Sequence, residues 1–219
     1  MRGLHQRLLI LAIAVTLTAA AMPAFPAPQS RGEALAALED SQTERRAEAV
    51  VWMANHGTMD DQPLLLKRLR DESAFVRGFA EQGLWLLWSR SGNAEIDRLM
   101  ATGVEQMQSG AHAQAIATFS EVIRRNPGFA EGWNKRATVH YLAGEYRKSL
   151  EDCAEVVKRN PWHFGALSGF GQVYFRLEEY GSALEWWRRA LEVNPNMLGV
   201  EMNIKGTEEL LRKKRGRAI

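Results

Sequence analysis

The residue types that most often carry catalysis or bind metals are sparse in this chain. Its five histidines are His5, His56, His112, His140 and His163. No two of them stand three or four residues apart, the spacing that places two metal ligands on one face of a helix. Cys153 is the only cysteine, which excludes an intramolecular disulfide and predicts a buried thiol. With no nucleophile elbow and no phosphate-binding loop, the sequence predicts no enzymatic activity, no metal and no cofactor.

Paired carboxylates occur where helices are expected to begin or end. They are Asp60-Asp61, Asp71-Glu72 and Glu178-Glu179. Acidic groups at a helix N-terminus gain about 0.3–1 kcal/mol from the helix dipole, which accounts for them without a catalytic role. The formal net charge of the chain is +2, and this balance lacks the strongly basic footprint of a nucleic-acid-binding protein.

A cluster of positive charge closes the sequence. It consists of Arg212, Lys213, Lys214, Arg215 and Arg217. Cations at a helix C-terminus, followed by a basic tail at 215–219, explain the cluster because they complement the helix dipole. The functional alternative is a weak contact with anionic lipid headgroups, worth roughly 1 kcal/mol per basic residue near a charged surface.

The first 27 residues have the pattern of a secretory signal peptide and a tether. Basic residues precede an apolar run at 8–21, and small residues suited to a signal peptidase place cleavage near 21–27. The alternative is an uncleaved inner-membrane anchor formed by residues 8–27. Pro23 and Pro26 oppose it, because a spanning helix needs about 20 suitable residues. We therefore expect an exported, periplasmic protein.

The elements that would position any site are helices. The dipeptide Asn-Pro recurs with a constant step of 34 residues, at Asn126-Pro127, Asn160-Pro161 and Asn194-Pro195. A 34-residue period is typical of stacked helix-turn-helix units, and proline ends each unit because it cannot continue a helix. No stretch alternates apolar and polar residues as a strand does. The sequence predicts an all-α protein.

Three units follow from this register: Ile96–Phe129, Ala130–His163 and Phe164–Met197. Each has a small residue where its two helices cross, at Gly103, Ala137 and Gly171. These features resemble the tetratricopeptide repeat family, over residues 94–197. The resemblance implies a right-handed α-solenoid whose first helices line a concave groove that binds peptides or partner helices.

The repeat register predicts which side chains face that groove. The predicted lining is Met100, Val104, Met107, Glu131, Asn134, Thr138, Tyr141, Leu142, Gln172, Phe175 and Arg176. It combines an apolar strip with amides able to bond a peptide backbone, and Glu131 and Arg176 place charge at opposite ends. Apolar patches of this kind are typical of interfaces. The alternative is that the N-terminal helices or a C-terminal helix cover this face.

One subset of the tetratricopeptide repeat family binds the carboxylate that ends a chaperone tail, using lysine, asparagine and arginine side chains. The matching positions in this chain are Met100, Val104, Lys135, Gly165 and Gly169. Only Lys135 is cationic, so the resemblance does not extend to binding a C-terminal carboxylate.

A second period, of 31 residues, precedes the array. Leu38, Asp40, Arg46 and Ala49 recur as Leu69, Asp71, Arg77 and Ala80. The acidic residue is expected to start a turn between two helices, and the arginine to begin the second helix. This pattern is similar to HEAT repeats over residues 33–89, within a helical region at 31–92. The alternative is that these helices form a generic cap on the array.

The short turn that follows predicts that this helical region and the array form one continuous superhelix. Residues 198–214 are expected to form a capping helix, because terminal repeats need a cover. Leu198, Met202, Leu210 and Leu211 are the apolar residues expected to provide it.

Taken together, these patterns predict an exported adaptor or scaffold that holds a protein or peptide in its groove, for assembly of a bacterial envelope complex. One alternative is a membrane-anchored scaffold with its leader retained. Another, of a different class, is an enzyme or enzyme subunit with its site at the junction of the two helical regions.

Overall fold

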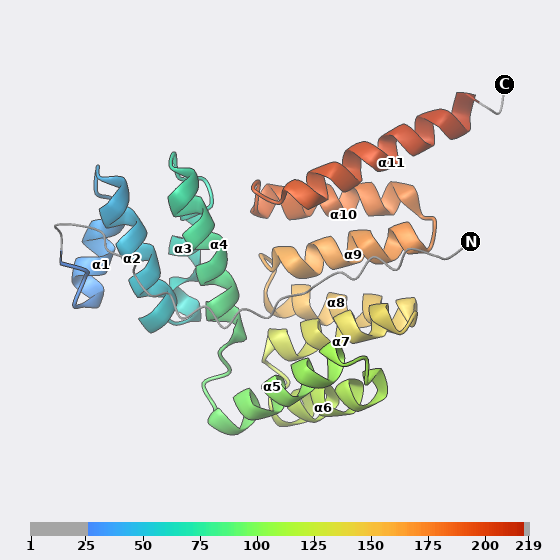
Figure 1. Ribbon diagram of the computed structural model, residues 1–219, viewed down its shortest axis with the longest axis horizontal. Coiled ribbons are helices and arrows are strands. Elements are labelled where there is room, and N and C mark those ends of the chain that lie inside the picture. Colours follow the sequence, from blue (N-terminus) through green and yellow to red (C-terminus); the bar gives the residue numbers. More distant parts are fainter. Residues whose placement is uncertain (1–25, 217–219) are drawn as a thin grey trace.

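The computed structural model describes residues 26–216, which form eleven α-helices and one short 3₁₀ helix, with no strand among them (Figure 1). The predicted leader and the end of the basic tail therefore lie outside the described residues. The prediction of an all-α solenoid is confirmed. None of the helices between residues 26 and 216 is long and apolar enough to span a bilayer.

The C-terminal part is an array of three antiparallel helix pairs stacked side by side (Figure 1). Its helices are α5 (Ala94–Gln108), α6 (His112–Arg125), α7 (Ala130–Leu142), α8 (Tyr146–Arg159), α9 (Phe164–Arg176) and α10 (Tyr180–Val193). Each pair ends at an asparagine that caps the second helix directly before a proline: Asn126, Asn160 and Asn194. Because proline cannot continue a helix, the chain turns at these points into the next pair.

The turn inside each pair needs a residue in the left-handed region of backbone conformation. Gly110 and Gly144 have φ of +79° and +77°, which glycine adopts without steric cost. The third repeat has Glu178 at the equivalent place, with φ of +61°. A residue with a Cβ is destabilised there by about 1–2 kcal/mol. The third turn is therefore the most strained of the three.

Close crossing of the helices in a pair depends on glycine in the outer two repeats. A Cβ on Gly103 would lie 2.6 Å from Cε1 of Phe119, and one on Gly171 would lie 2.3 Å from Cδ1 of Trp187. Both rings are buried, so each ring fills the space that a methyl group would need. The second repeat makes the same crossing with Ala137 and the small side chain of Cys153.

The N-terminal unit contains two further helix pairs. Its helices are α1 (Arg31–Leu38), α2 (Thr43–His56), α3 (Gln62–Arg68) and α4 (Ala74–Ser89), with the 3₁₀ helix η1 at Met59–Asp61. The leucines and alanines of the 31-residue period are all buried in one core: Leu38, Ala49, Leu69 and Ala80. The spacing read from the sequence therefore corresponds to equivalent buried positions.

The two arginines of the 31-residue period have the same role in the structure. Nη1 of Arg46 donates to the backbone carbonyl oxygens five and six residues before it, at 3.0 Å each. Nη1 of Arg77 makes the equivalent pair of hydrogen bonds, at 3.0 and 2.9 Å. Each arginine thus closes the turn that precedes its helix by satisfying carbonyl groups left without helical partners. The finer resemblance to HEAT repeats stays a prediction.

Arg46 also lies at the centre of a buried ion cluster between the two N-terminal pairs. Its Nε and Nη2 atoms each donate to the carboxylate of Asp71 at 2.9 Å, and Nη1 of Arg68 reaches the same carboxylate at 3.3 Å. Burial raises the pKa of Asp71, but the hydrogen bonds from Arg46 and from the backbone N–H of Ser73 outweigh this effect and hold the pKa below its usual value. The carboxylate therefore stays ionised between two cations.

The N-terminal unit docks on the side of the array instead of extending its stack. Helix α4 packs against α7 and the start of α9, where Trp88 stacks on His163 with ring centroids 4.4 Å apart. Farther along, Nη1 of Arg70 donates to the carbonyl oxygen of Val193 at 3.2 Å. The expected single continuous superhelix is therefore not formed, because the apolar face of α4 is buried against the turns between repeats.

Helix α11 (Leu198–Gly216) follows the third pair and packs on α10. Val200, Ile204 and Leu211 form the buried face of this contact. Leu198 and Met202 were expected to cover the last repeat, but each is 71% exposed. That detail of the prediction is wrong, since α11 turns a different face towards α10.

Candidate functional site

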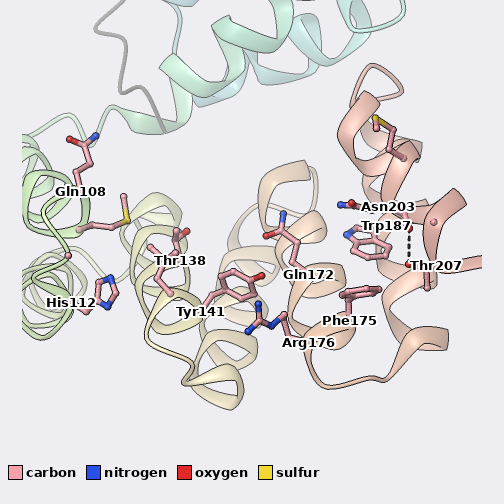
Figure 2. A pocket seen from close by; sticks show the side chains of 15 residues that line it. Gln108, His112, Thr138, Tyr141, Gln172, Phe175, Arg176, Trp187, Asn203 and Thr207 are labelled. Carbon is pink, nitrogen blue, oxygen red and sulfur yellow. Dashed lines mark hydrogen bonds between the residues drawn. The ribbon is translucent and has the colours of Figure 1, made fainter. Parts of the chain in front are cut away.

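A groove of about 1390 Å³ lies on the face formed by the first helices of the three repeats and extends to α11 (Figure 2). Its lining residues are Met107, Gln108, Gly110, His112, Thr138, Tyr141, Leu142, Gln172, Phe175, Arg176, Trp187, Met202, Asn203, Gly206 and Thr207. None of these lining residues comes from the N-terminal unit, and α11 supplies one wall of the groove.

Repeat symmetry explains most of this lining. The residues from α5, α7 and α9 fall on three helix positions that recur every 34 residues: Met107, Tyr141 and Phe175; Gln108, Leu142 and Arg176; and Thr138 and Gln172. Because the first helices stack side by side, each position adds to one surface that crosses the repeats. The fold thus positions the groove through the same spacing that sets the helix pairs.

The groove surface is largely apolar. Leu142, Phe175 and Met202 are 44%, 36% and 71% exposed within it. The ring of Phe175 is held in place by the rings of Tyr180 and Trp187, with centroid distances of 5.5 and 5.8 Å. Large apolar side chains exposed together on a concave surface are typical of a protein-binding site.

Seven of the eleven predicted groove residues line this groove: Met107, Thr138, Tyr141, Leu142, Gln172, Phe175 and Arg176. The other four lie elsewhere. Met100 and Val104 pack in the core of the first repeat, and Glu131 is only 2% exposed. Asn134 is 9% exposed and lines a smaller cavity that adjoins the groove. Glu131 therefore does not provide the charge that was expected at one end of the groove.

Glu131 is buried in a charged network beneath α4. Its carboxylate lies 2.9 Å from Nζ of Lys135 and 3.1 Å from Nε2 of His163. Nδ1 of His163 accepts a hydrogen bond from the backbone N–H of Ala166, so Nε2 holds the proton and donates to Glu131. Burial raises the pKa of Glu131, but Lys135 and His163 outweigh it and lower the pKa to about 2. The network fixes the turn on which the N-terminal unit docks.

A smaller cavity of about 250 Å³ lies between α7 and α9, next to the groove. Trp85 of α4 covers it, and the ring lies so close that a Cβ on Gly165 would be 2.3 Å from its Cη2 atom. Cys153 lines the cavity, and burial raises the pKa of its thiol to about 12. The first and third repeats have Phe119 and Trp187 at the equivalent position, so the small thiol leaves this space open.

The sequence prediction missed the wall of the groove that α11 provides. This wall consists of Met202, Asn203, Gly206 and Thr207, and His112 and Trp187 add to the lining from second helices. Helix α11 was expected to cap the last repeat or, as the alternative, to cover this face, but not to form one of its walls. One signal could have revealed its second role, because the 34-residue step from Thr138 to Gln172 leads next to Gly206.

Comparisons with known proteins agree with this geometry. Two family models, each described as tetratricopeptide repeat, match residues 100–161 and 165–197. A TPR repeat-containing protein of Rhizobium etli is 36% identical over 87 residues, which are 40% of this chain and 42% of that relative. The chain thus spans less than half the length of this relative.

Solved structures share the fold at low sequence identity. The Sgt2 TPR domain from Aspergillus fumigatus has a TM-score of 0.55 and 20% identity, covering 58% of this chain and 85% of that domain. The first TPR of Spaghetti, bound to the HSP90 peptide SRMEEVD, has a TM-score of 0.52 and 20% identity, covering 53% and 93%. With its 34-residue period, its glycine-dependent helix crossings and these matches, the C-terminal array of this chain belongs to the tetratricopeptide repeat family.

Proposed function

We propose that this protein is an adaptor that holds a segment of a partner protein in the groove between α5 and α11. The observation that carries the proposal is the exposure of Leu142, Phe175 and Met202 in one concave surface. A related fold supports it, since the first TPR of Spaghetti was solved with a peptide of HSP90. The adaptor function follows from the site, with the fold as supporting analogy.

The adaptor is further proposed to act in the periplasm of a bacterium, in the assembly of an envelope complex. This part depends on the leader pattern at 1–27, of which residues 1–25 lie outside the described residues. Retention of residues 8–27 as an inner-membrane anchor is the alternative. Mass spectrometry of the protein isolated from cell fractions tests both: a chain shortened near 21–27 in the periplasm supports export, and a full-length chain in the membrane fraction supports the anchor. Contact of the basic tail with anionic lipid stays a prediction.

An enzyme with its site at the junction of the two helical regions is the alternative of another class. The ionisable residues that meet there include Glu131 and His163, which are 2% and 0% exposed and bond to each other. A substrate would have to displace α4 to reach them. This closure favours binding in the open groove over catalysis at the junction.

Site-specific photo-crosslinking in cells tests the adaptor function. A photoreactive residue replaces Leu142 in the groove, and a control replaces Lys148, whose exposed side chain is on α8 and lines neither cavity. We expect a discrete adduct at position 142 and none at 148, and loss of that adduct in Tyr141→Ala/Phe175→Ala. Equal adducts at both positions, or an adduct that survives the double substitution with the fold intact, would contradict the assignment of the groove.

A further inference from the structure

The described residues that line the groove carry positive charge and no negative charge. Among its described lining residues, Arg176 is the one side chain with a permanent charge, and there is no aspartate or glutamate. No carboxylate oxygen of the described residues lies within 4.0 Å of its guanidinium. The neighbouring Glu178 instead faces Lys214, at 3.8 Å. Arg176 is thus a cation available to an anionic group from outside the chain.

The position of Arg176 limits what that group can be. Its guanidinium carbon lies 5.6 Å from the centroid of Tyr146, a cation–π contact that holds it over the ring. Figure 2 shows Arg176 between Tyr141 and Phe175, with lined groove continuing on both sides. A chain that reaches Arg176 therefore has surface to follow in both directions. A carboxylate opposite Arg176 can therefore belong to a side chain within a segment that continues along the groove on both sides.

Three amide side chains of the groove have no hydrogen-bond partner among the described residues. Gln108, Gln172 and Asn203 come from α5, α9 and α11, and none of them bonds to another described residue through its amide group. An amide offers a donor and an acceptor, which matches the free N–H and C=O groups of an extended peptide. A helical ligand would have satisfied most of those groups internally. The lining thus favours an extended segment.

We propose that the groove binds an internal, extended segment of the partner, with an aspartate or glutamate opposite Arg176 and bulky apolar residues on either side. The apolar residues pack on Leu142, Phe175 and Met202, and Arg176 forms a charge-assisted hydrogen bond with the carboxylate. This inference depends on the proposed function, because it names the chemistry of the ligand in the same groove. It places the charged contact away from Gly165 and Gly169, which line the smaller cavity beside Trp85.

A display library of randomised 12-residue peptides tests the inference, with both peptide ends fused so that no free carboxyl terminus is present. The library is selected against the purified protein, Arg176→Glu and the control Arg147→Glu. Arg147 is an exposed arginine on α8 that lines neither cavity. We expect the protein and Arg147→Glu to enrich an acidic residue between apolar ones, and Arg176→Glu to enrich lysine or arginine at that place. A synthetic copy of the best peptide should bind Arg176→Gln about tenfold more weakly than it binds the unmodified protein. Replacing the acidic residue of this peptide with its amide should weaken binding to Arg176→Gln little further, because the charged contact is already lost.

The outcomes separate this inference from the proposed function. Peptides without an acidic preference, or with a preference unchanged in Arg176→Glu, would overturn the inference. If Tyr141→Ala/Phe175→Ala still abolishes their binding while circular dichroism shows a folded protein, the groove keeps its proposed function. If no peptide is retained by the folded protein, both the ligand chemistry and peptide capture are contradicted.

Discussion

Both regions have apolar cores, but the N-terminal unit adds a buried ion cluster between its two helix pairs, whereas in the tetratricopeptide array the outer pairs are closed by aromatic rings packed against glycines. The cluster joins Arg46 to Asp71 at 2.9 Å, with side chains 6% and 2% exposed. The array instead places Trp187 where a Cβ on Gly171 would stand. The N-terminal unit thus adds the direction and charge of hydrogen bonds to its apolar core. The outer repeats depend on the fit of a ring against a glycine.

The two regions therefore tolerate different changes. An ion cluster keeps its stability only while the carboxylate is ionised and every partner is present, because an unpaired buried charge is costly. A ring on glycine is insensitive to pH but cannot admit an additional methyl group. The contact between the N-terminal unit and the array uses both ring packing and a charged hydrogen bond. Trp88 stacks on His163, and His163 donates to Glu131.

Removal of Asp71 should be the most damaging change. Asp71→Ala leaves Arg46 and Arg68 buried without their shared carboxylate, and breaking a buried pair in this way costs about 3–5 kcal/mol. Urea denaturation followed by tryptophan fluorescence measures the loss. Asp40→Ala is the matched control, because Asp40 is the equivalent residue of the 31-residue period but pairs with Arg45 at the half-exposed surface. There we expect a loss of at most about 1 kcal/mol, and losses of equal size would contradict the role given to the buried cluster.

The junction should make the stability of the array depend on pH. The pKa of Glu131 is lowered to about 2 from an ordinary value of 4.5. Its contribution is therefore fully present above about pH 4.5 and is lost as pH falls towards 2. About 2 kcal/mol should disappear between pH 6 and pH 3. Unfolding free energies measured across this range should show a shallower slope in Glu131→Gln, and an unchanged slope would show that the buried network does not supply the dependence.

Gly171→Ala should destabilise the array by about 1–2 kcal/mol through overpacking, since the new methyl group meets the buried ring of Trp187. Thermal and urea denaturation measure the effect, which should not change between pH 6 and pH 8. Gly181→Ala on α10 is the control: a Cβ at Gly181 would meet nothing within 4 Å. Its higher helix propensity should add up to about 1 kcal/mol of stability. If both substitutions stabilise, the close fit at Gly171 does not limit the array.

Repeated proline and glycine positions explain why the array could be predicted from the sequence. Each Asn-Pro step marks a helix end through backbone chemistry that needs no distant partner. The turn arginines of the N-terminal unit were also predictable, because Arg46 and Arg77 bond to carbonyl oxygens only five and six residues away. Local rules therefore fixed the helix pairs and most of the groove.

The remaining features depend on contacts between distant segments. Nothing near Glu131 in the sequence indicates that it bonds to His163, against which Trp85 and Trp88 of α4 pack, so the register alone placed its carboxylate in the groove. The buried face of helix α11 is a second feature that its own sequence does not determine. Its pattern contains several apolar residues, and packing on α10 selects Val200 and Ile204 while leaving Met202 free to line the groove. Which apolar face is buried is decided by the neighbour, not by the helix.

The turn of the third repeat offers the smallest expected effect and a gain in stability. Glu178→Gly should stabilise the protein by about 1 kcal/mol, because glycine adopts φ of +61° without the steric cost of a Cβ. Loss of the contact with Lys214 should matter little, since both side chains are more than half exposed. Glu178→Ala separates the two effects: it removes the carboxylate and keeps the Cβ, so its unfolding free energy in urea should stay near that of the unmodified protein. A gain from alanine equal to that from glycine would mean that the carboxylate, and not the backbone, strains this turn.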